Sequence, residues 1–119
     1  MKTILLLEDF GKLIGAYVLT FYLGFSWWAF FAWLLAPDIS MIGYLVNTKI
    51  GAWLYNIVHH QGVAVTIGLA GLAIGDSNLE FAGLLLFGHS AMDRIFGYGL
   101  KYEDDFKNTH LGWIGKQRL

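Results

Sequence analysis

Long apolar stretches interrupted by single polar positions dominate the hydrophobic pattern of this chain. Between Lys12 and Lys49 the only charged residue is Asp38. A helix needs about 20 mainly apolar residues to cross the hydrocarbon core of a membrane, so this stretch is too long for one crossing. The pattern therefore predicts several membrane-spanning helices.

The stretch from Lys12 to Lys49 can be divided in two ways. In one, Leu13–Ala36 is a single span and Pro37 begins a loop, which places Lys49 inside the membrane in the next helix. In the other, the chain turns at 24–26 and Ser26 caps the following helix. We favour the second division, with four spans over residues 4–23, 27–46, 50–75 and 79–100.

Charge placement supports this choice. Basic residues gather on one side of the four spans, whereas the turns at 24–26 and 75–78 carry no lysine or arginine; the residues on that side are Lys2, Lys12, Lys49, Lys101, Lys107, Lys116 and Arg118. Lysine and arginine favour the cytoplasmic side, so both termini are expected there, in the inner (plasma) membrane. The predicted fold is all-α: one transmembrane domain over 1–119, a bundle of four transmembrane helices with a cytoplasmic tail at 101–119. Glu8, Asp9 and Lys12 interrupt the first span, so this span can begin as an amphipathic segment on the membrane surface before it crosses.

Composition agrees with a membrane location. Hydrophobic residues make up 56% of the 119 residues and charged residues 14%, against roughly 45–50% and about 25% in soluble domains. A chain this small cannot bury that excess in its own core, so the lipid bilayer is its expected partner. The net charge of −1 gives no argument for nucleic acid, and the absence of cysteine excludes disulfides and thiolate sites. Assembly into a homo-oligomer is left open.

Small residues in the third span predict close helix packing. Ala64 with Gly68, and Gly71 with Gly75, follow a small-x-x-x-small spacing. This spacing lets the backbones of two helices approach closely in lipid.

Ionisable residues fall at similar depth in three spans. Asp38 lies near the middle of the second span, His59 and His60 near the middle of the third, and His89 near the middle of the fourth, with Asp93 one turn beyond it on the same face. A charged group at the centre of a bilayer costs about 2.5–3.5 kcal/mol or more. We therefore expect these side chains to face one another inside the bundle.

The residue types in this cluster are those that bind divalent metals. Imidazole and carboxylate groups are ligands of zinc, manganese and iron, and His89 and Asp93 can offer two ligands from one helix. His59 or His60 can supply a third, although adjacent helical residues diverge by about 100°. The same cluster is also compatible with a structural hydrogen-bond network or with a proton or ion pathway.

Two further residues suit catalytic roles beside such a metal. Asp38 is a candidate fourth ligand or a general base that activates a bound water. Arg94 is suited to an anionic group such as phosphate, because its guanidinium forms paired hydrogen bonds.

Several motifs resemble a known family across nearly the whole chain. They are the segments 37–44 (PDISMIGY), 51–59 with Gly51-Ala52, Tyr55-Asn56 and His59, 89–102 (HSAMDRIFGYGLKY) and 109–112 (THLG). The chain resembles the small multi-pass bacterial membrane proteins grouped as domain of unknown function 4260, which implies fold and location but no activity. A fainter similarity links it to bacterial membrane-bound metal-dependent hydrolases. Ser40 occupies the position where these hydrolases have a second acidic residue. The chain therefore lacks a carboxylate that two-metal chemistry would need.

Together these observations lead to two functional hypotheses. The first is a membrane-embedded, metal-assisted hydrolase of a lipid or lipid-linked substrate, with metal ligands among His59, His60, His89 and Asp93 and with catalytic Asp38 and Arg94. The second is a non-enzymatic membrane protein, either a proton or ion conductor or a helical subunit of a larger assembly.

Overall fold

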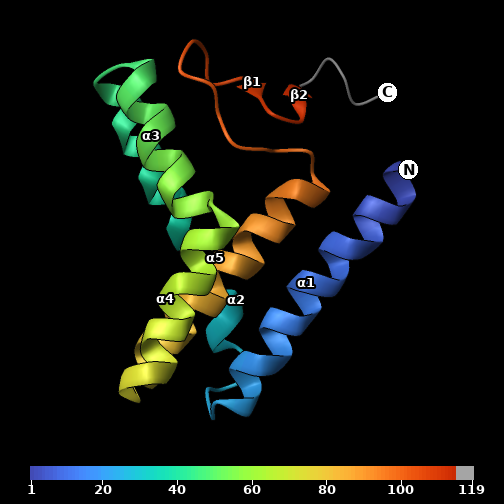
Figure 1. The fold of residues 1–119 in the computed structure, drawn as a ribbon, viewed down its shortest axis with the longest axis vertical. Coiled ribbons are helices and arrows are strands. Elements are labelled where there is room, and N and C mark those ends of the chain that lie inside the picture. The colour runs from blue at the N-terminus through green and yellow to red at the C-terminus, as the bar shows by residue number, and fades with distance from the viewer. Residues whose placement is uncertain (115–119) are drawn as a thin grey trace.

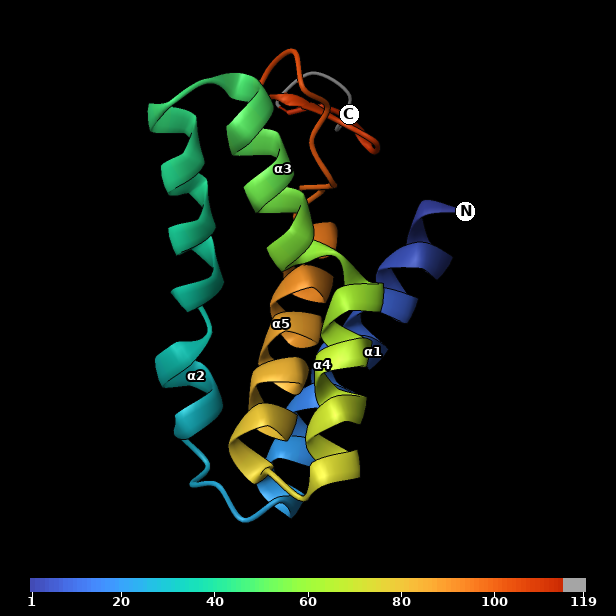
Figure 2. The same ribbon diagram turned by 60° about the vertical axis from the view of Figure 1, so that its left-hand side comes forward.

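The computed structural model of the protein describes residues 1–114. The chain runs four times between the two ends of an elongated helical bundle (Figures 1 and 2). The four passes consist of α1 (Lys2–Tyr22), then α2 (Ala29–Trp33) with the 3₁₀ helix η1 (Ala36–Leu45), then α3 (Thr48–His59) with α4 (Gln61–Ile74), and finally α5 (Ser77–Ile95). A short antiparallel hairpin, β1 (Asn108–Thr109) and β2 (Gly112–Trp113), follows them. The all-α class is confirmed.

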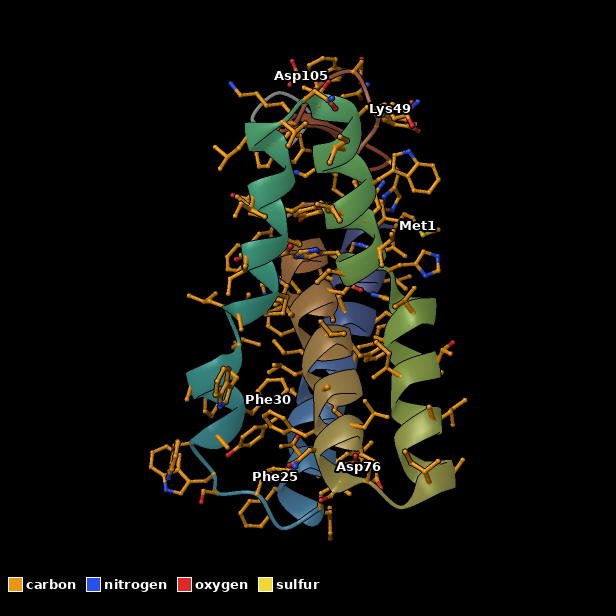
Figure 3. The ribbon with its side chains drawn as sticks, turned by 90° about the vertical axis from the view of Figure 1, so that its left-hand side faces the viewer. Met1, Phe25, Phe30, Lys49, Asp76 and Asp105 are labelled. Carbon is orange, nitrogen blue, oxygen red and sulfur yellow. The ribbon has the colours of Figure 1, made fainter. Side chains whose placement is uncertain are left out.

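The turns of the bundle lie at two opposite ends. Lys49 and Asp105 lie at one end, Phe25 and Asp76 lie at the other, and Met1 lies in the half that contains Lys49 (Figure 3). The turns at this second end use glycines in the left-handed region, at φ 94° for Gly24 and φ 72° for Gly75, which side chains other than glycine rarely adopt.

The expectation of one continuous helix over 27–46 is wrong. The α-helix α2 ends at Trp33, and η1 begins at Ala36 with Pro37 in its first turn. Proline lacks an N–H and disfavours the α conformation in the residue before it, so a helix tends to end there. Ser26 is not the cap of α2 either, because the N-cap position is Trp28.

The expectation of one continuous helix over 50–75 is also wrong, because the chain breaks at His60. His60 is extended, with φ −78° and ψ 122°, and its Nδ1 accepts a hydrogen bond from Val63 N at 3.2 Å, which caps α4. Ser90 Oγ donates to the carbonyl of His59 at 2.7 Å. Side chains that bond to the backbone in this way compete with helix continuation. One hydrogen bond therefore stabilises the end of α3, and the other stabilises the start of α4.

The first and last passes agree better with the predicted spans. The helix α1 covers span 4–23 almost completely, and α5 covers 79–100 except for its last five residues. Within residues 1–114, no single helix has both the length and the apolar character to cross a membrane, whereas α3 and α4 together do, across a 49° bend.

The predicted close packing occurs between α4 and α5. Ala64 is buried, and a Cβ atom added to Gly83 would lie 2.5 Å from Gly68 N and 2.8 Å from Ala64 O. The two backbones are therefore in contact, as the small-x-x-x-small spacing predicted. Gly75 has a different role, because it ends α4 instead of packing against a neighbour.

The segment after α5 folds back over α3. Asn56 holds the backbone of Lys101 with two hydrogen bonds, from Lys101 N at 2.6 Å and to Lys101 O at 2.8 Å. Lys101 is only 5% exposed, and its Nζ lies 3.9 Å from the ring centroid of Phe106 and 4.7 Å from that of Tyr55. Lys101 therefore lies inside the folded-back segment and is not at its surface.

His110 makes the docking of this segment sensitive to pH. Its Nδ1 accepts a hydrogen bond from Leu100 N at 2.8 Å. Burial, followed by the charge of Arg94, lowers the pKa of His110 below its usual 6.5. The undocked segment therefore binds a proton more readily, so docking is fully stable above pH 6.5 and weakens as the pH falls through the lowered pKa.

Hydrogen exchange tests this expectation. The protection factor of the Leu100 amide, corrected for intrinsic exchange, should fall as the pH is lowered below 6.5. His110→Ala should remove most of this pH dependence, whereas His60→Ala should leave it unchanged. Equal protection of Leu100 on both sides of this pH would contradict the prediction.

Candidate metal centre

Four side chains from three elements meet in the middle of the bundle. Asp38 comes from η1, His59 from the end of α3, and His89 and Asp93 from α5. One potential ligand atom from each residue lies within 4.8 Å of all the others. The structure thus brings together four of the six residues proposed from sequence, and we call this group the metal cluster.

Backbone carbonyls orient both histidines of the metal cluster. His89 Nδ1 lies 2.6 Å from Leu34 O, and His59 Nδ1 lies 2.9 Å from Tyr55 O. Because a carbonyl oxygen only accepts hydrogen bonds, each Nδ1 carries the hydrogen, and in the neutral ring Nε2 keeps its lone pair. Metal-binding histidines commonly donate their other ring N–H to a carbonyl in this way.

Both Nε2 atoms face carboxylate oxygens. His59 Nε2 lies 3.4 Å from Asp38 Oδ1 and 3.4 Å from Asp93 Oδ2, while His89 Nε2 lies 3.0 Å from Asp38 Oδ1 and 3.6 Å from Asp93 Oδ1. Within residues 1–114, His59 Nε2 is buried and has no hydrogen-bond partner. A lone pair facing two carboxylates is repulsive unless a positive charge, a proton or a metal cation, lies between them.

The spacing of these atoms suits a small cation. Zinc binds nitrogen and oxygen ligands at about 2.0–2.2 Å in a tetrahedron, which places its ligands about 3.3 Å apart. The nitrogen-to-oxygen distances in the metal cluster lie between 3.0 and 3.6 Å. The nitrogen-to-oxygen distances are therefore close to those of a metal site, and the widest separation in the group, within 4.8 Å, would shorten around an ion.

Tyr55 supports two members of the cluster. Its hydroxyl donates a hydrogen bond to Asp93 Oδ2 at 2.8 Å, and its ring stacks on the His59 ring with centroids 3.8 Å apart and an interplanar angle of 6°. The sequence places Tyr55 one turn before His59, but it does not indicate the contact with Asp93. The carbonyls that orient the histidines have no signal in the sequence, because every residue carries one.

The cluster is enclosed on all sides but one. The side chains of His89, His59 and Asp93 are 1%, 3% and 11% exposed, whereas that of Asp38 is 40% exposed. The cluster can therefore be reached from outside the bundle at Asp38.

Two residues proposed from sequence lie outside the cluster. His60 caps α4 and lines a separate cavity of about 310 Å³ together with Trp53 and Glu103. Arg94 is half-buried, and in the described part of the chain its guanidinium makes no hydrogen bond or ion pair; the carboxylates of Asp9 and Asp93 act on it electrostatically.

Comparisons with known proteins identify a family without assigning a role to these residues. Residues 2–114 match the family described as Domain of unknown function (DUF4260). No curated protein and no solved structure matches the chain. Because the match covers almost the entire sequence, the chain belongs to the DUF4260 family.

Proposed function

We propose that this protein is a multi-pass protein of the inner (plasma) membrane that binds one divalent metal ion and hydrolyses a lipid or lipid-linked substrate. The buried Nε2 of His59, which has no partner within residues 1–114 and faces the carboxylates of Asp38 and Asp93, carries this proposal. A divalent cation would satisfy the lone pair and both negative charges at once.

The surface of the bundle supports the membrane location. Large apolar side chains are more than half exposed on the first three passes, for example Leu7, Trp33, Ile42 and Leu69, whereas α5 is covered by its neighbours. Soluble proteins rarely expose apolar patches of this extent, whereas lipid solvates them. The separation of Lys49 and Asp105 from the turns at Phe25 and Asp76 agrees with a bundle that crosses the bilayer (Figure 3).

The exposures of the four side chains suggest how the roles divide. We assign His59, His89 and Asp93, which are buried, as the ligands of the metal. A metal held by these three ligands would leave a fourth position for water and would lower the pKa of that water, to about 7 for zinc. Asp38, the accessible carboxylate, is placed to accept a proton from such a water and to return it to the leaving group. Ser40 offers no second carboxylate after Pro37, so a single ion is expected.

Elemental analysis tests the proposal directly. Protein purified in detergent without chelator is expected to contain one equivalent of zinc, manganese or iron. Asp38→Asn should keep this metal but lose release of hydrolysis products from a membrane lipid extract. A folded wild-type protein that contains no metal and takes up none on dialysis would overturn the proposal.

Tyr55→Phe is expected to weaken metal binding about 10- to 100-fold, the range found when a group that orients a ligand is removed. The change deletes the hydroxyl that donates to Asp93 Oδ2 and leaves the ring that stacks on His59. Competition with a chromophoric chelator measures the affinity. Tyr44→Phe is the matched control, because Tyr44 packs against Phe106 instead. Equal affinities for the two variants would contradict the supporting role of Tyr55.

One observation favours a second candidate function, a proton or ion conductor. The α3–α4 pass is broken beside His59 with a bend of 49°, and ion sites in transporters often lie where a membrane helix is interrupted. Reconstituted vesicles would then show a pH-dependent flux that His59→Ala abolishes. If the protein is the metal-dependent hydrolase instead, the vesicles should show no ion flux and the protein should contain the metal.

A further inference from the structure

Lys101 is buried among aromatic rings close to the metal cluster. It is only 5% exposed, although lysine is rarely buried in proteins. Its Nζ lies 3.9 Å from the ring centroid of Phe106, 4.7 Å from that of Tyr55 and 6.0 Å from that of Tyr98. Aromatic faces attract a cation at such distances, which favours the charged ammonium. These three rings, which we call the ring cage, therefore enclose a positive charge inside the protein.

Tyr55 connects this ammonium to the metal cluster. Its hydroxyl donates a hydrogen bond to Asp93 Oδ2 at 2.8 Å, and its ring stacks on the His59 ring. The ammonium of Lys101 lies over the same Tyr55 ring. Lys101 and two members of the metal cluster thus contact one side chain.

The backbone of the folded-back segment holds Lys101 in this position. Asn56, which precedes the cluster on α3, accepts a hydrogen bond from Lys101 N at 2.6 Å and donates one to Lys101 O at 2.8 Å. Where the segment leaves α5, Tyr98 N donates to the carbonyl of Asp93 at 2.7 Å. The distance between the ammonium and the cluster is therefore set by the fold.

The charge that Lys101 meets at the cluster depends on whether a metal is bound. Asp38 and Asp93 carry two negative charges, and the histidines are charged only if protonated. A divalent cation neutralises both carboxylates, so the attraction for Lys101 is lost. The other charged groups around Lys101 keep their charge when a metal binds, so they cancel when the empty and loaded states are compared.

The size of this effect follows from Coulomb's law. Two unit charges about 10 Å apart, at an effective dielectric constant of about 20, change a binding constant roughly tenfold. Lys101 and Asp93 lie on this scale of distance, because both contact Tyr55. A buried pair is also screened little by salt.

We propose that Lys101 is the counter-charge of the metal-free cluster and that it lowers the affinity of the cluster for a divalent metal. The inference rests on the proposed function, because it describes the regulation of the same metal cluster. In the empty cluster the ammonium offsets the carboxylates, which stabilises the docked segment. A bound metal takes over this role and repels Lys101. Metal binding and segment docking therefore weaken each other by the same factor.

The zinc affinity of full-length protein in detergent tests this inference. Lys101→Met removes the charge and keeps an unbranched side chain in the ring cage, whereas Lys101→Arg keeps the charge. Lys107→Met, which removes an exposed lysine from the same segment, is the matched control. Each protein is titrated with zinc against a chromophoric chelator, and the metal content of every sample is measured.

We expect Lys101→Met to bind zinc about tenfold more tightly than the wild type. Lys101→Arg and Lys107→Met should bind zinc as tightly as the wild type does. A purely structural role of Lys101 predicts the opposite change for Lys101→Met, because a loosened Tyr55 would orient Asp93 and His59 less well.

The wild type offers a second measurement that needs no variant. Hydrogen-exchange protection of the Lys101 amide, which reports its bond to Asn56 Oδ1, should fall about tenfold when saturating zinc is added at constant pH. Equal or weaker zinc binding by Lys101→Met would overturn the inference and leave the metal centre standing, and so would unchanged or increased protection with zinc. A wild type that takes up no divalent metal would refute the metal centre itself, and this inference with it.

Discussion

Replacing His59 with alanine is expected to abolish metal binding, whereas the same change at the adjacent His60 should leave the metal in place. His59 Nε2 faces both carboxylates of the cluster, so its loss removes a ligand. We expect the affinity to fall by more than about 100-fold, beyond the range seen when only an orienting group is lost. His60 instead caps α4 through Val63 N, and losing a cap costs about 1 kcal/mol.

The comparison is informative because the two variants change the same side chain at neighbouring positions. Metal content and affinity are measured by elemental analysis and chelator competition, and folding by circular dichroism in detergent. If His59→Ala keeps a full equivalent of metal, or if both variants lose it equally, the assignment of ligands is wrong.

Gly83→Ala is expected to destabilise the bundle by about 2 kcal/mol, within the range for overpacking a tight interface. The added Cβ would lie 2.5 Å from the backbone nitrogen of Gly68, and backbone atoms cannot move aside without separating α4 from α5. Gly68→Ala, across the same interface, meets only Gly83 Cα at 3.9 Å. It should therefore be neutral, or stabilising by up to about 1 kcal/mol through helix propensity.

Unfolding in mixed detergent micelles measures both variants against the wild type. A stability of Gly83→Ala equal to that of the wild type would show that the two helices are not in backbone contact. Marked loss of stability in Gly68→Ala would show that the interface is tighter than its geometry indicates.

Hydropathy showed that the apolar stretches are too long for fewer crossings, and the placement of lysine and arginine chose between the two ways to divide residues 12–49. Hydropathy did not predict the breaks at Pro37 and His60, because the mean hydropathy of a segment does not show whether its helix is continuous. Pro37 was visible in the sequence as a helix breaker. The break at His60 was not, because it depends on Ser90, which is distant in the sequence and bonds to the carbonyl of His59.

The members of the metal cluster were predicted from their similar depth in the predicted spans. The structure brings Asp38, His89 and Asp93 together with one of the two adjacent histidines. The choice between His59 and His60 was not accessible from sequence. It depends on the extended backbone of His60, which turns its ring toward α4. Arg94 shares a helix with Asp93, yet the rotation of about 100° between adjacent residues gives it different surroundings.

The winding of η1 couples two distant regions of the protein. In a 3₁₀ helix residues three apart lie in line, so Asp38, Met41 and Tyr44 share one edge. This alignment lets Asp38 face the metal ligands while Tyr44 meets Phe106 of the folded-back segment. Rewinding the same ten residues as an α-helix would turn Asp38 and Tyr44 about 120° apart. The 3₁₀ periodicity of η1 thus determines the orientation of Asp38 and the contact with the folded-back segment together.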